Sequence, residues 1–301
     1  MNILILGLGF KKQDTTYEME RLEAGLQARG HTVFCSLWSD VLFSFGKETT
    51  ITTQGKDIAF FDYVICRYPL STTTERPSRE IIVSSFLVRM YKHFVMLVDY
   101  AQHHNTKVLN QDVCGTLSSY DKMTQHYILQ KHSIPTLPSF LYTGYNQTHY
   151  PLKKPFVAKT IEGSRGVEVF LVHTDKELKE IVEQYGAGNV LVQQFVPNRK
   201  DYRLITIGDT VIGGVLCVNE NDFRTNAFMG GDREKIEPSR AMKQLALTAK
   251  NALNAECTGI DIIQSNNQYY VLEVNIFPMF MGFENATGID FVDALAQHIE
   301  T

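Results

Sequence analysis

The sequence predicts a mixed α/β protein that begins with an open α/β domain and continues with α+β units. Asn2 to Leu6 is a continuous apolar run typical of a buried parallel strand, and a helix pattern follows over 16–29. The next strand is expected over 32–37, so the chain starts with the β-α-β order of an open α/β domain. Strands and an amphipathic helix within 106–188 indicate a smaller α+β unit.

Four further features belong to the first part of the chain. A strand expected over 60–66 ends at Arg67, and such strand ends bind ligands in open α/β sheets, so Arg67 is either a contact for an anionic substrate or a surface arginine. The region 81–100 is apolar but contains three charged residues, which favours a buried helix over a membrane span. The last strand of this part is expected at 108–110. Gly7-Leu8-Gly9 lacks the third glycine of a dinucleotide fingerprint.

The rest of the chain alternates strands with helices. Thr174 and Glu177 have the spacing of a capping box, and 219–231 is a polar loop. The expected helices cover 120–132, 174–186, 239–254 and 290–300. The expected strands cover 139–143, 155–159, 167–172, 189–195, 203–207, 210–218, 259–263 and 269–274.

The composition predicts an ordinary cytoplasmic globular protein. The formal net charge is −4 and no block of one sign stands out, so neither nucleic acid nor a membrane surface is expected as a partner. The five cysteines are widely spaced without a C-x-x-C pair, which favours reduced core residues. Met1 to Leu8 is too short for the apolar part of a signal peptide and has no basic flank.

The two strands expected over 259–263 and 269–274 indicate a metal site. Alternation puts Glu273 and Asn275 on one strand face, and Asp261 can lie near them if the strands pair as a hairpin. Two carboxylates and an amide oxygen suit Mg²⁺, which binds carboxylates together with substrate phosphates. The alternative is a solvated strand face with scattered polar residues.

Two other segments carry groups suited to phosphate. Lys159 ends a strand and is followed by Gly163-Ser164-Arg165-Gly166, whose backbone N–H groups could point at phosphate oxygens. The alternative is a plain hairpin turn with a surface lysine. Arg224-Thr225-Asn226 lies in a polar loop, and Asp201 and Arg203 precede it. Phosphoryl transfer depends mostly on positioning and charge neutralisation, which arginine forks supply.

With these motifs in this order along the chain, the sequence resembles the ATP-grasp superfamily and, within it, the RimK-like carboxylate–amine ligases of the glutamate type. The resemblance covers about 120–285, and each piece is weak while the combination is specific. The matching pieces are Asp121-Lys122, Lys159, Glu162 to Val167, the strand 190–196, Asp201-Tyr202-Arg203, Asp222 to Asn226, Gly230-Gly231, Gly259-Ile260-Asp261, Leu272 to Asn275 and Pro278.

The resemblance implies a fold and a division into domains. An N-terminal open α/β domain, 1–110, would precede a two-subdomain ATP-grasp fold. Its central subdomain would cover 111–188, and its C-terminal subdomain, 189–301, would carry the metal site.

The resemblance also implies roles for residues. ATP would contact Lys122, Lys159, Gly163, Ser164, Arg165, Gly166, Gln193, Gln194, Phe195, Val196 and Asp201. Two Mg²⁺ ions, or Mn²⁺ in their place, would be held by Asp261, Glu273 and Asn275. The catalytic residues that stabilise the transferred γ-phosphoryl group would be Arg224, Asn226 and Arg203.

The implied reaction joins a carboxylate to an amine through an acyl phosphate, with release of ADP and phosphate. The implied substrates are small molecules, amino acids or peptides, and family members are often dimers or tetramers. Gln194 stands where many members have glutamate, and the bulky residues 276–280 suggest a narrower substrate pocket unless they are core packing. Two alternatives remain: a non-catalytic nucleotide-binding module, and a small-molecule phosphotransferase.

Overall fold

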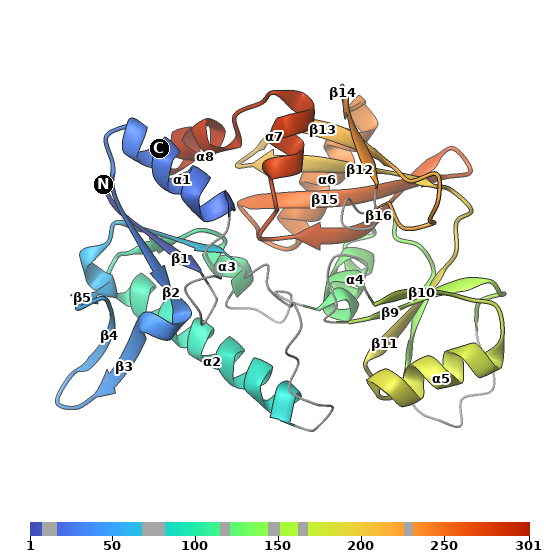
Figure 1. Ribbon diagram of the computed structural model, residues 1–301, viewed down its shortest axis with the longest axis horizontal. Helices are drawn as coiled ribbons and strands as arrows, with labels where there is room; N and C mark the ends of the chain where they lie inside the picture. The colour runs from blue at the N-terminus through green and yellow to red at the C-terminus, as the bar shows by residue number, and fades with distance from the viewer. Residues whose placement is uncertain (8–16, 68–81, 115–120, 144–150, 162–167, 226–230) are drawn as a thin grey trace. The chain divides into compact units, whose positions relative to one another are not determined.

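The computed structural model describes residues 1–7, 17–67, 82–114, 121–143, 151–161, 168–225 and 231–301 (Figure 1). The chain forms two compact units. The first contains residues 1–116, 279–281 and 290–301, and the second contains 117–278 and 282–289. Within the described ranges, no helix is both long enough and apolar enough to cross a membrane.

The first unit is built on a parallel four-stranded sheet in the order β2-β1-β6-β7. Its strands are β1 Asn2–Gly7, β2 Thr32–Leu37, β6 Tyr63–Arg67 and β7 Lys107–Val108. Its helices are α1 Tyr17–Ala28, α2 Ile82–His103, α3 Gln111–Cys114 and α8 Phe291–Ile299. The open α/β domain expected from the β-α-β start is therefore present.

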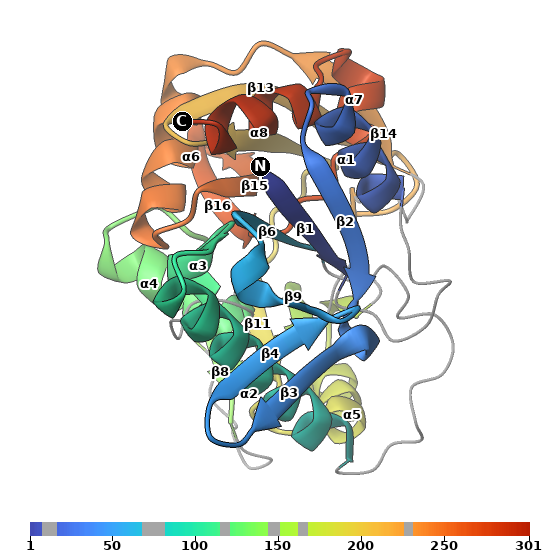
Figure 2. The same ribbon diagram turned by 90° about the vertical axis from the view of Figure 1, so that its left-hand side faces the viewer.

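A small antiparallel sheet between β2 and β6 was not expected from the sequence. It consists of β3 Val41–Phe45, β4 Thr49–Thr53 and β5 Lys56–Asp57, and Figure 2 shows β3 and β4 side by side, facing the viewer. It leads into a short 3₁₀ turn, Ile58–Phe60, which Asp57 caps by accepting the Ala59 N–H at 2.8 Å. The strand expected over 60–66 therefore begins only at Tyr63.

The expected strand at 108–110 is also shorter than predicted. β7 ends at Val108, and Asn110 has a left-handed backbone with φ of 61°. A residue in that conformation cannot continue a β-ladder, so the chain turns directly into α3.

The C-terminal helix α8 packs in the first unit. Phe291, Leu295 and Ile299 are buried, as its periodicity predicted. Phe280 is fully buried and stacks on Phe291 with ring centroids 4.2 Å apart, so Phe280 is core packing. Arg67 is only 6% exposed, with its guanidinium 5.6 Å from the Phe280 ring centroid. The surface interpretation of Arg67 is therefore wrong.

The second unit contains two antiparallel sheets. The four-stranded sheet has the order β10-β9-β11-β8 and consists of β8 Ser139–Tyr142, β9 Phe156–Thr160, β10 Val169–Val172 and β11 Val190–Gln194. The five-stranded sheet has the order β14-β13-β12-β15-β16 and consists of β12 Lys200–Ile207, β13 Thr210–Val218, β14 Asp232–Ile236, β15 Cys257–Ser265 and β16 Gln268–Asn275. The helices are α4 Lys122–Lys131, α5 Asp175–Tyr185, α6 Arg240–Ala252 and α7 Met281–Thr287.

Side-chain caps set the start of α4 and α5. Asp121 accepts the Thr124 N–H at 2.6 Å and begins α4, and the predicted capping box of Thr174 and Glu177 begins α5. Such caps satisfy N–H groups that have no partner inside the helix. They also fix Lys122 as the first residue of α4, next to the backbone end of β9, where its N–H donates to Ile161 O at 3.1 Å.

Helix α4 is joined to β16 through Gln125. The Gln125 side chain donates to Val274 O at 2.9 Å and accepts the Val274 N–H at 3.2 Å. Farther along the same strand, the Val271 N–H donates to Pro135 O at 2.8 Å. Apolar residues of α4, α6 and the five-stranded sheet, including Leu129, Met242 and Val271, form one core beneath these contacts.

Candidate active site

A row of charged side chains crosses the five-stranded sheet. Arg203 on β12 lies opposite Asp261 on β15, and Asp261 lies opposite Glu273 on β16. Residues directly opposite one another in antiparallel strands share a face, and so do residues two apart in one strand. Asn275 and Asp201 therefore lie on the same face, and the hairpin that the sequence predicted around Asp261 and Glu273 is formed.

Arg203 and Asp261 form a two-bond ion pair. Nε and one terminal nitrogen of Arg203 each donate to a different Asp261 oxygen at 2.7 Å. The side chains are 16% and 13% exposed, so solvent screens the pair only weakly. Burial opposes the positive charge, but the Asp261 carboxylate holds the pKa of Arg203 above its ordinary value. A side chain at Gly259 would crowd Pro278, because an added Cβ would lie only 3.1 Å from the Pro278 side chain and 3.9 Å from the Arg203 stem.

The donor set at this row fits a hard cation. Asp261 and Glu273 supply carboxylates on adjacent strands, and Asn275 Nδ2 lies 3.4 Å from an Asp261 oxygen. Each carboxylate oxygen has a second lone pair, so Asp261 can accept from Arg203 and still face a cation. For Asn275 to supply its oxygen, its carboxamide must turn over. In the part of the chain that is described, no three His, Cys, Asp or Glu side chains form a metal-binding group, so a cation here would rely on two carboxylates and further oxygens.

Lys159 on β9 faces this row from the four-stranded sheet. Its ammonium group donates to Gln193 Oε1 at 3.1 Å, and Gln193 in turn donates to Ser139 at 3.1 Å. Burial, together with the nearby Lys122, lowers the pKa of Lys159 to about 8, and Glu273 and Asp261 oppose this lowering. A buried lysine with this environment gains most from an added anion such as phosphate.

His126 was not identified from the sequence, although it lies one helical turn beyond Lys122 on α4. Its Nε2 is 3.3 Å from Thr136 Oγ1 and 3.4 Å from Gln130 Nε2. Burial and the charge of Lys159 lower the pKa of His126 to about 4. The imidazole is therefore neutral at physiological pH, and it adds no charge beside Lys159.

Replacing His126 by glutamine should reduce the loss of stability in acid. The unfolded chain takes up a proton on this histidine near pH 6.5 and the folded chain only near pH 4, so folding is favoured less as pH falls between these values. Between pH 7.5 and 4.5, the free energy of unfolding of the parent should fall by about 2–3 kcal/mol more than that of His126→Gln. Urea unfolding at both pH values measures it. The exposed His132→Gln at the end of the same helix is the control, and an unchanged pH dependence in His126→Gln would contradict the prediction.

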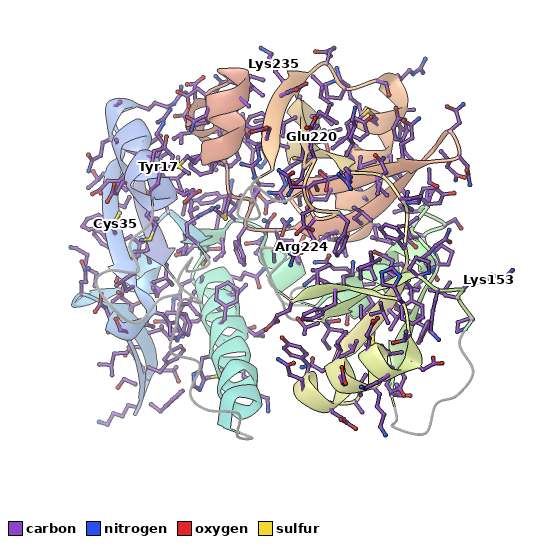
Figure 3. All side chains as sticks on the ribbon, turned by 45° about the vertical axis from the view of Figure 1, so that its right-hand side comes forward. Tyr17, Cys35, Lys153, Glu220, Arg224 and Lys235 are labelled. Atoms are coloured by element: carbon purple, nitrogen blue, oxygen red, sulfur yellow. The ribbon has the colours of Figure 1, made fainter. Side chains whose placement is uncertain are left out.

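A loop over 219–225 holds Arg224, and Figure 3 labels Arg224 and Glu220 in this loop. The Arg224 guanidinium donates to Asp222 from Nε at 3.1 Å and from NH2 at 2.6 Å. The Thr225 hydroxyl donates to Asp201, whose pKa is raised by burial and by the nearby Asp261. Asp201 is thus bonded to the loop that carries Arg224.

The residues at the end of β11 and directly after it have different surroundings. Gln193 is buried and bonded to Lys159, whereas the Gln194 side chain is exposed and its backbone N–H donates to Pro138 O at 2.9 Å. Phe195 meets Phe223 of the 219–225 loop edge-on, with centroids 6.2 Å apart. Val196 is buried against Leu137 and Ile263.

Five expected site residues lie outside the described residues. Gly163, Ser164, Arg165 and Gly166 belong to the expected phosphate loop, and Asn226 follows Thr225. The other expected residues all belong to the second unit. Asp222, Thr225 and His126 were not assigned roles from the sequence. The bond of Thr225 to Asp201 and the charge of Lys159 near His126 depend on separate segments coming together. The bond of Asp222 to Arg224 is local, so the Asp-x-Arg spacing was a signal that could have identified it.

The arrangement combines groups that neutralise phosphate with groups that hold a cation. Lys159 supplies positive charge beside Glu273 and Asp261, and Arg203 lies on the same sheet face as these carboxylates. Such a site stabilises charge that develops on phosphoryl oxygens.

Comparison with known proteins agrees with this geometry. Residues 119–299 match the model of the RimK-like ATP-grasp domain. A probable alpha-L-glutamate ligase of Shewanella loihica is 28% identical over 100% of this chain and 95% of its own length. The ATP-grasp ligase PsnB, solved with a minimal precursor, superposes with a TM-score of 0.72 at 21% identity, covering 99% of this chain and 97% of PsnB. The D-alanine–D-alanine ligase of Bacillus anthracis, solved with ATP, gives 0.67 at 16% identity, with 100% and 97% covered.

The solved structures show that the chain has the fold of these ATP-grasp proteins. The family match covers more than half of the chain, and the chain belongs to the RimK-like ATP-grasp family. It is an ATP-dependent ligase that forms carbon–nitrogen bonds between a carboxylate and an amine. The comparisons therefore favour the ligase interpretation over the two alternatives, the non-catalytic module and the phosphotransferase.

Proposed function

We propose that the chain activates a carboxylate as an acyl phosphate in the second unit and then transfers the acyl group to an amine. The observation that carries this proposal is the row of Arg203, Asp261 and Glu273, which faces the buried ammonium group of Lys159. A carboxylate is a poor acylating agent until one of its oxygens is phosphorylated. The protein must therefore neutralise charge and align reactants, and it needs no nucleophile of its own.

The steps balance as follows. A carboxylate oxygen of the acid attacks the γ-phosphorus of ATP, and the bond from that phosphorus to ADP breaks. The amine nitrogen then attacks the carbonyl carbon, and phosphate leaves with the former carboxylate oxygen. Lys159 and Lys122 would neutralise ATP phosphates, and Arg203 and Arg224 would stabilise the transferred phosphoryl group.

The remaining assigned residues would support the nucleotide and the cation. Gln193 would hold Lys159, while Gln194, Phe195 and Val196 would border the adenine. Asp261, Glu273 and Asn275 would hold Mg²⁺, which supplies charge neutralisation to the phosphate oxygens when bound. Gly163, Ser164, Arg165, Gly166 and Asn226 keep their expected roles as part of this proposal.

For the substrates, we propose amino acids or peptides, with L-glutamate as the first candidate. The relatives named alpha-L-glutamate ligases support this choice. The bulky Phe280, which suggested a narrower pocket, is buried in the core of the first unit, so it gives no reason to exclude glutamate. The four cysteines whose surroundings are described form no disulfide, which supports a reducing, cytoplasmic setting for the reaction.

Hydroxylamine trapping tests the proposal. Purified protein is given Mg²⁺, ATP, hydroxylamine and single acids from a panel of amino acids and dipeptides that includes L-glutamate. An acyl phosphate reacts with hydroxylamine to give a hydroxamate, so we expect ADP and one hydroxamate to form in equal amounts. Lys159→Met should abolish both products, whereas Lys153→Met, which removes an exposed lysine just before β9, should not.

Stable phosphorylation of an acceptor without a hydroxamate would overturn the acyl phosphate proposal. Hydroxamate formation that persists unchanged in Lys159→Met would instead overturn the assigned role of Lys159.

A further inference from the structure

The loop over 219–225 is organised by one buried side chain. Asn219 is only 3% exposed. Its carboxamide oxygen accepts the N–H groups of Asn221 and Asp222, both at 3.1 Å, and its nitrogen donates to Arg224 O at 2.8 Å. These bonds satisfy backbone groups that no strand partner satisfies, so Asn219 gives the loop a defined conformation.

Asp222 acts on Arg224 in two ways. Its carboxylate accepts the Arg224 backbone N–H at 2.9 Å, which fixes the turn. It also accepts Nε at 3.1 and 3.2 Å and NH2 at 2.6 Å from the Arg224 side chain. The two side chains are 24% and 20% exposed, and two-nitrogen contact to a carboxylate fixes the plane of a guanidinium group as well as its place.

The same loop is tied to the charged row and to the segment after β11. The Thr225 hydroxyl donates to Asp201, which shares its strand with Arg203. Phe223 meets Phe195 edge-on, and the Arg224 guanidinium lies 5.7 Å from the Phe223 ring centroid. The loop is thus anchored on both sides of Arg224, by Phe223 and by Thr225. The long side chain of Arg224 itself is held by Asp222.

We propose that Asp222 is a positioning residue that orients the Arg224 guanidinium toward the γ-phosphate of ATP. This inference rests on the proposed function, since it takes Arg224 as a phosphoryl contact. An arginine side chain without such a partner samples many rotamers, and ordering it would reduce the free energy gained on binding. Hydrogen bonds from Arg224 hold the pKa of Asp222 below its ordinary value, so the ion pair persists at neutral pH.

The substitution Asp222→Asn tests the proposal with little change of shape. Asparagine can still accept the Arg224 backbone N–H, so the turn is retained, but it lacks the charge and one of the two acceptor oxygens. We expect Mg²⁺-dependent affinity for β,γ-imido-ATP to fall about 10-fold and affinity for ADP to change less than about 2-fold, because only the triphosphate has the group that Arg224 would meet. In the hydroxamate assay, kcat should fall about 10–100-fold while KM for the acid changes little.

Two further variants separate positioning from general damage. Asp209→Asn removes a fully exposed carboxylate that pairs with Lys250 in the same unit, and it should change neither affinity. In an Arg224→Ala background, Asp222→Asn should have less than about 2-fold further effect, because Asp222 acts only through Arg224.

Calorimetric titration with the two nucleotides needs neither an acid nor an amine, so it decides the role of Asp222 even if no hydroxamate forms and the ligase proposal fails. Equal loss of affinity for both nucleotides would overturn the inference. It would also be overturned by unchanged affinities, by a full effect in the Arg224→Ala background, or by a protein that binds neither nucleotide.

Discussion

Replacement of Arg203 by alanine is expected to lower the free energy of unfolding by about 3 kcal/mol and kcat/KM by at least about 10³-fold. The substitution removes both donors to Asp261 and leaves that carboxylate, only 13% exposed, without its ion-pair partner. Removing one partner of a shielded ion pair lowers the free energy of unfolding by more than the pair itself contributes, because the remaining charge cannot regain its full hydration. Urea unfolding with a chelator present measures stability, and ADP release measures activity.

Two variants sharpen this experiment. Arg203→Lys keeps the charge but cannot form two bonds in one plane, so it should recover part of the stability and little of the activity. Arg199→Ala removes an exposed arginine of the same unit and should cost less than about 1 kcal/mol. An Arg203→Ala protein as stable as the parent would show that Asp261 does not depend on this partner.

Glu273→Gln is expected to raise the Mg²⁺ concentration for half-maximal activity at least about 10-fold and to lower kcat about 10²–10³-fold. Glutamine has nearly the same shape, so packing on β16 is retained while one of the two carboxylates in the row is neutralised. Glu273 also supports the charged form of Lys159, so its loss should lower the pKa of Lys159 below about 8. Measurement of ADP release over a range of Mg²⁺ and Mn²⁺ concentrations gives both quantities.

Glu234→Gln serves as the matched control for Glu273→Gln, because Glu234 is an exposed carboxylate on β14 of the same sheet. It should leave the Mg²⁺ dependence unchanged. If Glu273→Gln required no more Mg²⁺ than the parent, the metal site would have to lie elsewhere.

The strand pair that carries Asp261 and Glu273 could be predicted because its signals are local. Alternation fixes which residues share a face, and Asn266 and Asn267, with φ of 48° and 62°, form the tight turn that their side-chain types favour. The turn alone would place Asp261 opposite Leu272, and a β-bulge between Asp261 and Ile262 shifts the register so that Asp261 lies opposite Glu273. This shift has no signal in the local pattern. The ion pair of Arg203 with Asp261 could not be predicted in this way, because it depends on the pairing of β12 with β15 across 58 residues.

The elements missed from the sequence have weak or misleading patterns. The strand β14 reads Asp-Arg-Glu-Lys-Ile, and an edge strand needs no apolar face when much of it meets solvent. The short helix α7 contains Gly282, which a helix pattern does not favour; an added Cβ there would lie 1.5 Å from the Arg233 side chain. Arg233 therefore occupies the space that a larger residue would need.

The double hydrogen bond between Gln125 and Val274 limits which sequences this fold accepts. A side chain that both donates and accepts, without charge and at this reach, is supplied by glutamine alone among residues of its length. Glutamate would place a negative charge next to the Val274 carbonyl oxygen. Leucine would leave the buried N–H and carbonyl of Val274 without these hydrogen bonds. Related sequences with another residue at position 125 should therefore pack the first turns of α4 differently against β16. This position should thus mark subgroups in which the distance between Lys122 and Glu273 differs.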